Sequence, residues 1–100
     1  MATFYTQSIT SGTETAVTYD YNGYSSMIFT NTDPSDAVTI DLYIKNSAGT
    51  IVAYFLNNVK IPNGVSLKLE SNEFSFDNNT YTLYIDSADA DGKIDIITRY

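Results

Sequence analysis

The feature that most limits what this chain can fold into is an alternation of apolar and polar residues with a period of two. It is clearest from Ala37 to Lys45, where Val38, Ile40, Leu42 and Ile44 alternate with Thr39, Asp41, Tyr43 and Lys45. Successive side chains of a β-strand point to opposite faces of its sheet, so this spacing predicts a strand with one face in a core and the other in water. No stretch of the sequence sustains the apolar spacing of a helix.

The same alternation recurs along most of the chain. It is strong in residues 65–70, 81–86 and 94–97, and weaker in residues 3–9, 16–21 and 24–30. The run from Ile51 to Leu56 is apolar at every position, which predicts a strand with apolar side chains on both faces. We therefore expect about eight strands in total.

Residues that favour turns separate these predicted strands. Asn22-Gly23 and Pro62-Asn63-Gly64 tolerate a positive φ, and Asp33-Pro34-Ser35-Asp36 places proline at the second position of a type I turn. Residues 46–49 and 77–79 are two further turn segments. Short strands with a turn about every 8–12 residues are typical of a β-sandwich or a small barrel.

These patterns predict one all-β domain. Its 100 residues suffice for a single hydrophobic core, and 43% of them are hydrophobic. We predict that residues 1–100 form a single β-sandwich of about seven or eight antiparallel strands, either immunoglobulin-like or jelly-roll-like. Residues 1–12, which begin a region rich in Ser and Thr, are expected to form either an exposed arm or an edge strand.

Composition excludes several classes of function. Twelve acidic and five basic residues give a net charge of −7, which repels phosphate backbones and anionic lipids, so neither nucleic acid nor a membrane is an expected partner. The absence of Cys and His removes thiolate nucleophiles, imidazole bases and the commonest zinc ligands. Two carboxylates can serve a glycosidase, but a sandwich of this size with short loops rarely builds the necessary cleft. We expect a protein that is not an enzyme and needs no cofactor.

An acidic segment resembles the middle of a calcium-binding loop. In the run SADADGKID, residues 87–95, carboxylates alternate and a glycine permits a sharp turn between them. The candidate calcium ligands are Ser87, Asp89, Asp91 and Asp95. Against a metal site, the first ligand position is a serine, the twelfth is Thr98 in place of a bidentate Glu, and the flanks are predicted strands. The alternative is an acidic hairpin loop without an ion.

The aromatic residues indicate a protein-binding surface. The chain has nine Tyr and five Phe but no Trp, the ring that sugar-binding platforms usually use. A domain this small cannot bury both faces of every strand, so some of these rings are expected to remain exposed. The candidate interface residues are Phe4, Tyr5, Tyr43, Tyr54, Tyr84 and Tyr100.

Two runs of the sequence, LYIKNSAGT at residues 42–50 and LNNVKIPNGVSLKL at residues 56–69, include a corner of the form NV-x-IP-x-G. Together with the opening MATFYT, these runs resemble small β-sandwich virion proteins of tailed bacteriophages, especially marine and cyanobacterial phages. The resemblance implies a structural protein without catalytic residues. It implies a capsid decoration protein that binds the major capsid protein, or alternatively a head–neck, tail or baseplate accessory protein.

The same resemblance implies a location in the virion, assembled in the host cytoplasm, and copies that form a homo-oligomer or a symmetric array. The first basic residue is Lys45, so the basic start of a secretory signal is not found. Two functions of other kinds stay open beside the virion role. They are a carbohydrate-binding or receptor-binding module and a calcium-dependent adhesion domain.

Overall fold

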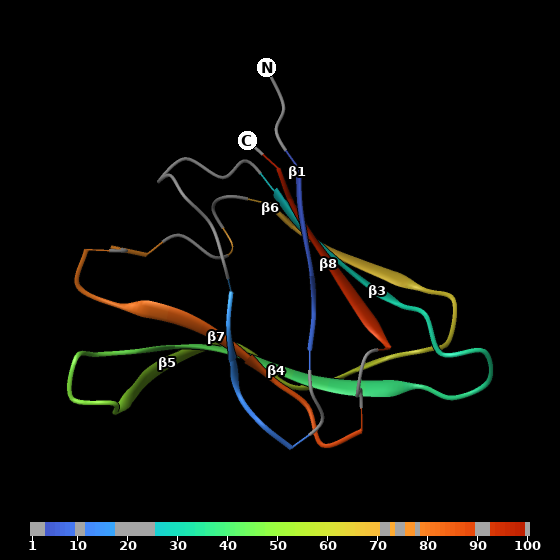
Figure 1. Ribbon diagram of the computed structural model, residues 1–100, viewed down its shortest axis with the longest axis horizontal. Coiled ribbons are helices and arrows are strands. Elements are labelled where there is room, and N and C mark those ends of the chain that lie inside the picture. Colours follow the sequence, from blue (N-terminus) through green and yellow to red (C-terminus); the bar gives the residue numbers. More distant parts are fainter. Residues whose placement is uncertain are drawn as a thin grey trace.

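The computed structural model consists of two β-sheets (Figure 1). It describes residues 4–9, 12–17, 26–70, 73, 76–77, 79–89 and 93–99. These residues form eight strands: β1 (Phe4–Ser8), β2 (Thr15–Ala16), β3 (Ser26–Asn31), β4 (Val38–Lys45), β5 (Ile51–Ile61), β6 (Ser66–Glu70), β7 (Thr82–Asp86) and β8 (Ile94–Arg99). The strand pairs of the described residues are all antiparallel, which confirms the predicted all-β sandwich.

The strand order of the described residues is β1-β8-β3-β6 in one sheet and β2-β7-β4-β5 in the other. Four pairings nest within one another along the sequence: β1 with β8, β2 with β7, β3 with β6 and β4 with β5. The chain is thus folded like one long hairpin whose strand pairs alternate between two sheets, which is the order of a jelly roll. The immunoglobulin-like alternative is wrong, because that order places the first two strands side by side in one sheet.

The core between the sheets comes from the inward positions of the alternating strands. All four apolar residues of β4 that the pattern placed inward are buried. They are joined by Met27 and Phe29 of β3, Leu83 and Ile85 of β7, and Ile94 and Ile96 of β8. Burying one such side chain contributes about 1.5–3 kcal/mol, so this cluster is the main source of stability.

The N-terminal segment is part of the sandwich. β1 pairs with β8 along all five of its residues, and the nearby Ile9 and Val17 are buried in the core cluster. Residues 1–12 were predicted to form either an exposed arm or an edge strand, and Phe4–Ser8 form an edge strand. The strand predicted at residues 16–21 is observed at Thr15–Ala16, and residues 18–21 lie outside the described residues.

β5 is longer than the apolar run that predicted it, because it continues through two asparagines to Ile61. Its pairing with β4 shifts at three places. At the first shift, Asn58 has a φ of 54° and its N–H donates to Asp41 Oδ1 on β4 at 2.7 Å. An extra residue held in this way is a β-bulge, which lets the strand continue past positions that do not fit the alternation.

Candidate interaction site

Three tyrosines form one row across the outer face of the β2-β7-β4-β5 sheet. The register pairs Tyr43 of β4 with Tyr84 of β7 on one side and with Tyr54 of β5 on the other. The Tyr43 ring is stacked with Tyr84 at a centroid distance of 6.2 Å and meets the Tyr54 ring edge-on at 5.4 Å. Such pairs contribute about 0.5–1.5 kcal/mol each beyond the area they bury. The structure therefore brings together three of the predicted interface residues.

Tyr43 is the buried centre of this row, although it projects away from the core between the sheets. Glu14, which precedes β2, accepts hydrogen bonds from the Tyr43 hydroxyl and the Lys45 ammonium group. Burial, followed by the Glu14 carboxylate, raises the pKa of Tyr43, and the hydrogen bonds from Lys45 and Tyr43 lower the pKa of Glu14. The prediction of Tyr43 as an exposed interface residue is wrong, because neighbouring rings and a segment distant in sequence cover it.

A group of exposed apolar residues lies on the first half of β5. Ile51, Val52 and Tyr54 are 38%, 45% and 49% exposed, and Ala53 between them is exposed as well. Residues 46–56 contain no charged residue, in a chain whose net charge is −7. The β4–β5 turn that precedes this segment lies at one end of the molecule (Figure 1). We call residues 51–54 the β5 apolar strip, and it is the strongest candidate site for docking another protein.

Two other predicted interface residues lie in the other sheet. Phe4 and Tyr5 lie on β1, in the other sheet, where the register pairs them with Arg99 and Thr98 of β8. Tyr100 lies outside the described residues. The six residues predicted to form an interface are therefore not gathered on one surface.

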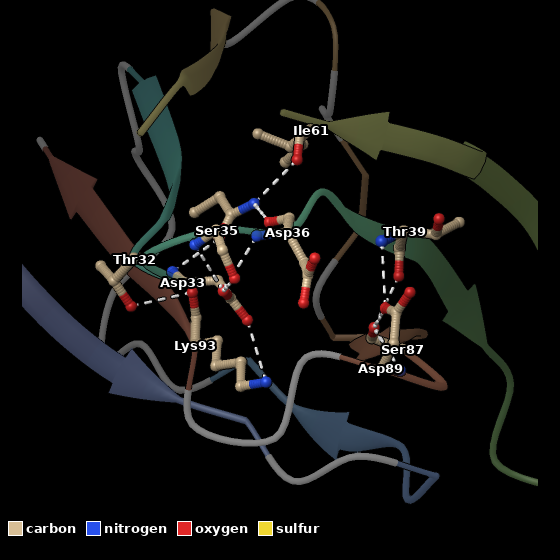
Figure 2. Close-up of polar contacts among 10 residues, drawn as sticks. Thr32, Asp33, Ser35, Asp36, Thr39, Ile61, Ser87, Asp89 and Lys93 are labelled. Carbon is tan, nitrogen blue, oxygen red and sulfur yellow. Dashed lines mark hydrogen bonds and ion pairs between the residues drawn. The ribbon is translucent and has the colours of Figure 1, made fainter. Parts of the chain in front are cut away.

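Two of the predicted calcium ligands are bonded to β4. Ser87 is buried, and its hydroxyl proton is shared between the Thr39 carbonyl oxygen at 2.6 Å and Asp89 Oδ1 at 2.9 Å. Asp89 Oδ1 also accepts the Thr39 N–H at 3.1 Å. Figure 2 shows how this network connects the end of β7 to the start of β4. Both side chains therefore have a structural role that needs no ion.

The remaining two predicted ligands lie elsewhere. Asp91 is outside the described residues, and Asp95 is an exposed residue of β8, which belongs to the other sheet from β4. Among the residues that the structure describes, no three His, Cys, Asp or Glu side chains form a group that could hold a metal ion. Calcium binding by Ser87, Asp89, Asp91 and Asp95 stays a prediction from the sequence.

A second polar network begins at Asn31, the last residue of β3, which is 1% exposed. Its Nδ2 donates to the carbonyl oxygens of Asp36 and Ile61, both at 2.9 Å, and its Oδ1 accepts the Asp33 N–H at 2.8 Å. One buried amide thus connects the end of β3, the turn before β4 and the end of β5. Because these three bonds satisfy the buried side-chain amide of Asn31, we expect Asn31 to hold this corner in one arrangement.

Asp33 completes the corner (Figure 2). Its Oδ1 accepts the N–H groups of Ser35 at 2.9 Å and Asp36 at 3.0 Å, and its Oδ2 forms an ion pair with Lys93 at 2.9 Å. The Ser35 N–H, then Lys93 and the Asp36 N–H, hold the pKa of the Asp33 carboxyl well below its ordinary value. The sequence predicted a turn at this point but gave no sign that Lys93, from the segment before β8, would contact it.

Comparison with known proteins gives no relative to compare the site with, since no family model, curated protein or solved structure matches the chain. No helix within the described ranges is long and apolar enough to cross a bilayer.

Proposed function

We propose that the protein is a non-enzymatic structural subunit of a tailed-phage particle and that it docks on another particle protein through the β5 apolar strip. The observation that carries this proposal is the exposure of Ile51, Val52 and Tyr54 next to one another on an uncharged segment. Single exposed apolar residues are normal on soluble proteins, whereas a contiguous group marks an interaction site.

The fold and the charge support this role. Jelly rolls are frequent among viral capsid domains, and the runs at residues 42–50 and 56–69 resemble phage virion proteins. A net charge of −7 opposes non-specific association of free copies, while the uncharged segment around the strip lowers that repulsion where docking occurs.

The small size of the β5 apolar strip favours capsid decoration over a neck or tail role. Three side chains and one short strand segment bury less than the roughly 1,200 Å² that a stable pairwise interface needs. Durable attachment through such a contact requires many simultaneous copies, so that each weak contact strengthens the others. A capsid surface offers many equivalent sites, and a neck or tail offers few.

A carbohydrate-binding role has less support from the tyrosine row. Sugar stacking requires the open face of an aromatic ring. Tyr43 is buried and Tyr84 is only partly exposed, so Tyr54 is the one ring of the three with a largely open surface. The row therefore offers a single exposed ring and not a platform.

The test is reconstitution on capsids that lack the protein. The wild-type chain should cosediment with these capsids at a fixed ratio, and a Val52→Ser/Tyr54→Ser variant should bind at least about tenfold more weakly. Val65→Ser is a matched control, because Val65 lies outside the strip and is 43% exposed, close to the 45% of Val52. It should bind as wild type does.

Each outcome of this reconstitution has a definite meaning. Binding to purified tails in place of capsids would move the protein to the accessory role. Binding of the double variant at wild-type strength, with far-ultraviolet circular dichroism showing that it is folded, would refute docking through the strip.

A further inference from the structure

Each sheet of the sandwich ends in two edge strands, and an edge strand can pair with a further strand of another chain. Among the described residues, these edges are β1 and β6 in one sheet and β2 and β5 in the other. Natural sheets protect such edges by making them short, by interrupting them with bulges, or by placing charged residues or proline on them.

Three of the four edges carry such protection. β2 is short, with only two residues. β5 is interrupted by three shifts in its register with β4, which disturb the regular spacing of its outward groups. β6 carries Lys68 and Glu70, which form an exposed ion pair at 3.3 Å. A regular strand from another chain would pair poorly with any of them.

β1 carries none of these features. Its sequence, FYTQS, contains no charged residue and no proline. Its register with β8 is unbroken from the pair Phe4–Arg99 to the pair Ser8–Asp95. We propose that β1 pairs edge to edge, in antiparallel orientation, with β1 of a second copy of the chain.

Symmetry favours a second copy as the occupant of this edge. Antiparallel pairing of a strand with itself is a closed two-fold contact, in which each copy supplies the same surface. When all five residues overlap, Thr6 lies opposite Thr6 of the second copy, and Phe4 lies opposite Ser8. The two four-stranded sheets then become one sheet of eight strands, a number that open sheets reach without splitting.

Charge favours the same arrangement. The edge itself is neutral in a chain of net charge −7, so two copies approach there with less repulsion than at a charged part of the surface. In the joined sheet, one row of register positions contains Arg99 and Phe4 of one copy, then Ser8 and Asp95 of the other. Arg99 of each copy thus lies in the same row as Asp95 of the other copy. The Arg99 position of one copy and the Asp95 position of the other are three strand spacings apart, about 14 Å. Their attraction is weak at physiological salt and serves mainly to select the antiparallel orientation.

This contact goes beyond the proposed virion role and does not depend on it. β1 and β5 belong to different sheets, so a dimer formed through β1 leaves both β5 apolar strips available. If the virion role also holds, the dimer would present two docking strips on one molecule, which strengthens attachment to a repetitive surface without any new contact.

Single cysteines test the β1 contact directly, because the natural chain has none. In the proposed dimer, the two copies of position 6 lie directly opposite each other in the register, at the Cα separation of about 4.5–5.5 Å that a disulfide between two Thr6→Cys residues accepts. Lys68→Cys is the matched control, since Lys68 is the middle residue of β6, the five-residue strand at the opposite edge of the same sheet. Under mild oxidation, T6C should give several-fold more covalent dimer than K68C.

Sedimentation of the wild-type chain over a range of concentrations should show a monomer–dimer equilibrium. Cross-linking of T6C no greater than that of K68C would overturn the proposal, whatever the mass of the wild type. If T6C does not fold, hydrogen exchange of the wild type decides the matter. Protection of alternate β1 amides that rises with concentration supports the contact, and protection independent of concentration overturns it. The Val52→Ser/Tyr54→Ser variant should still dimerise, which separates this test from that of the β5 apolar strip.

Discussion

Asp33 joins the turn between β3 and β4 to the distant segment before β8. Its carboxylate binds two N–H groups of its own turn and the ammonium group of Lys93, and these contacts lower its pKa. A carboxyl whose pKa is lower in the folded than in the unfolded state stabilises the fold above its ordinary pKa, here 3.8. That contribution is lost as the pH falls below 3.8 through the lowered native value.

We predict that Asp33→Asn lowers the thermal unfolding temperature at pH 7 and that the difference from wild type shrinks as the pH falls below 3.8. Asp36→Asn, which changes an exposed carboxyl of the same turn, should have a much smaller effect. Circular dichroism melting from pH 2 to 7 measures both. If the unfolding temperature of Asp33→Asn stays below that of wild type by a constant amount over this range, the stabilising role of the ionised Asp33 carboxyl is contradicted.

Ser26 is a residue at which the fold is not optimal. It is buried at the start of β3, and its hydroxyl has no hydrogen-bond partner among the described residues. Because a buried hydroxyl without a partner keeps its desolvation cost, Ser26→Ala should raise the free energy of unfolding by about 1 kcal/mol. Thr30→Val on the same strand breaks a 2.8 Å bond with Ser66 and should not stabilise. Urea titration of the two variants checks this, and a less stable Ser26→Ala would refute it.

At the scale of elements, the tyrosine row connects the segment before β2 to β4. Tyr43→Phe keeps the ring contacts but removes the hydroxyl that donates to Glu14. Because that acceptor is charged but partly exposed, we predict a loss of about 1 kcal/mol in the free energy of unfolding. Tyr54→Phe, at an exposed ring, should change it by less than about 0.5 kcal/mol. Equal effects of the two substitutions in urea titration would contradict the buried role of Tyr43.

The strands themselves were largely predictable from the sequence, because burial of one face imposes a period of two. The prediction for residues 37–45 agrees with β4 to within one residue. β5 was predicted too short, since Asn57 and Asn58 interrupt the apolar run and the bulge that accommodates them depends on Asp41 of the neighbouring strand. The sequence pattern within one strand does not show that a residue of the neighbouring strand, here Asp41, will bond to it.

The candidate site was predictable only in part. The alternation placed the tyrosines opposite the core, but it could not show that Glu14, which is 29 residues from Tyr43 along the chain, would help to bury the central one. Asn31 did have a signal: it follows Met27 and Phe29 at the inward spacing, and a polar residue there must be bonded internally. The partners of Asn31 still required the strand order.

For the whole molecule, the nested pairing makes most contacts distant in sequence. β1 and β8 pair although about 90 residues separate them along the chain. The β2–β7 and β3–β6 pairs also join strands that are distant in sequence. We therefore predict refolding on the millisecond-to-second scale typical of β-sandwiches. Stopped-flow tyrosine fluorescence can follow it, because the chain has nine Tyr and no Trp. Complete refolding in microseconds would contradict the nested order.

The position of β8 between β1 and β3 has a consequence for biosynthesis. As the chain leaves the ribosome, β1 is the first described strand to emerge, and its one neighbour among the described strands of its sheet is formed by residues 94–99. The β1–β8 and β3–β8 pairs therefore form only after translation has passed β8, the last described strand, whereas the β3–β6 pair can form earlier. Until then, the nascent chain exposes a neutral strand able to pair with other nascent chains.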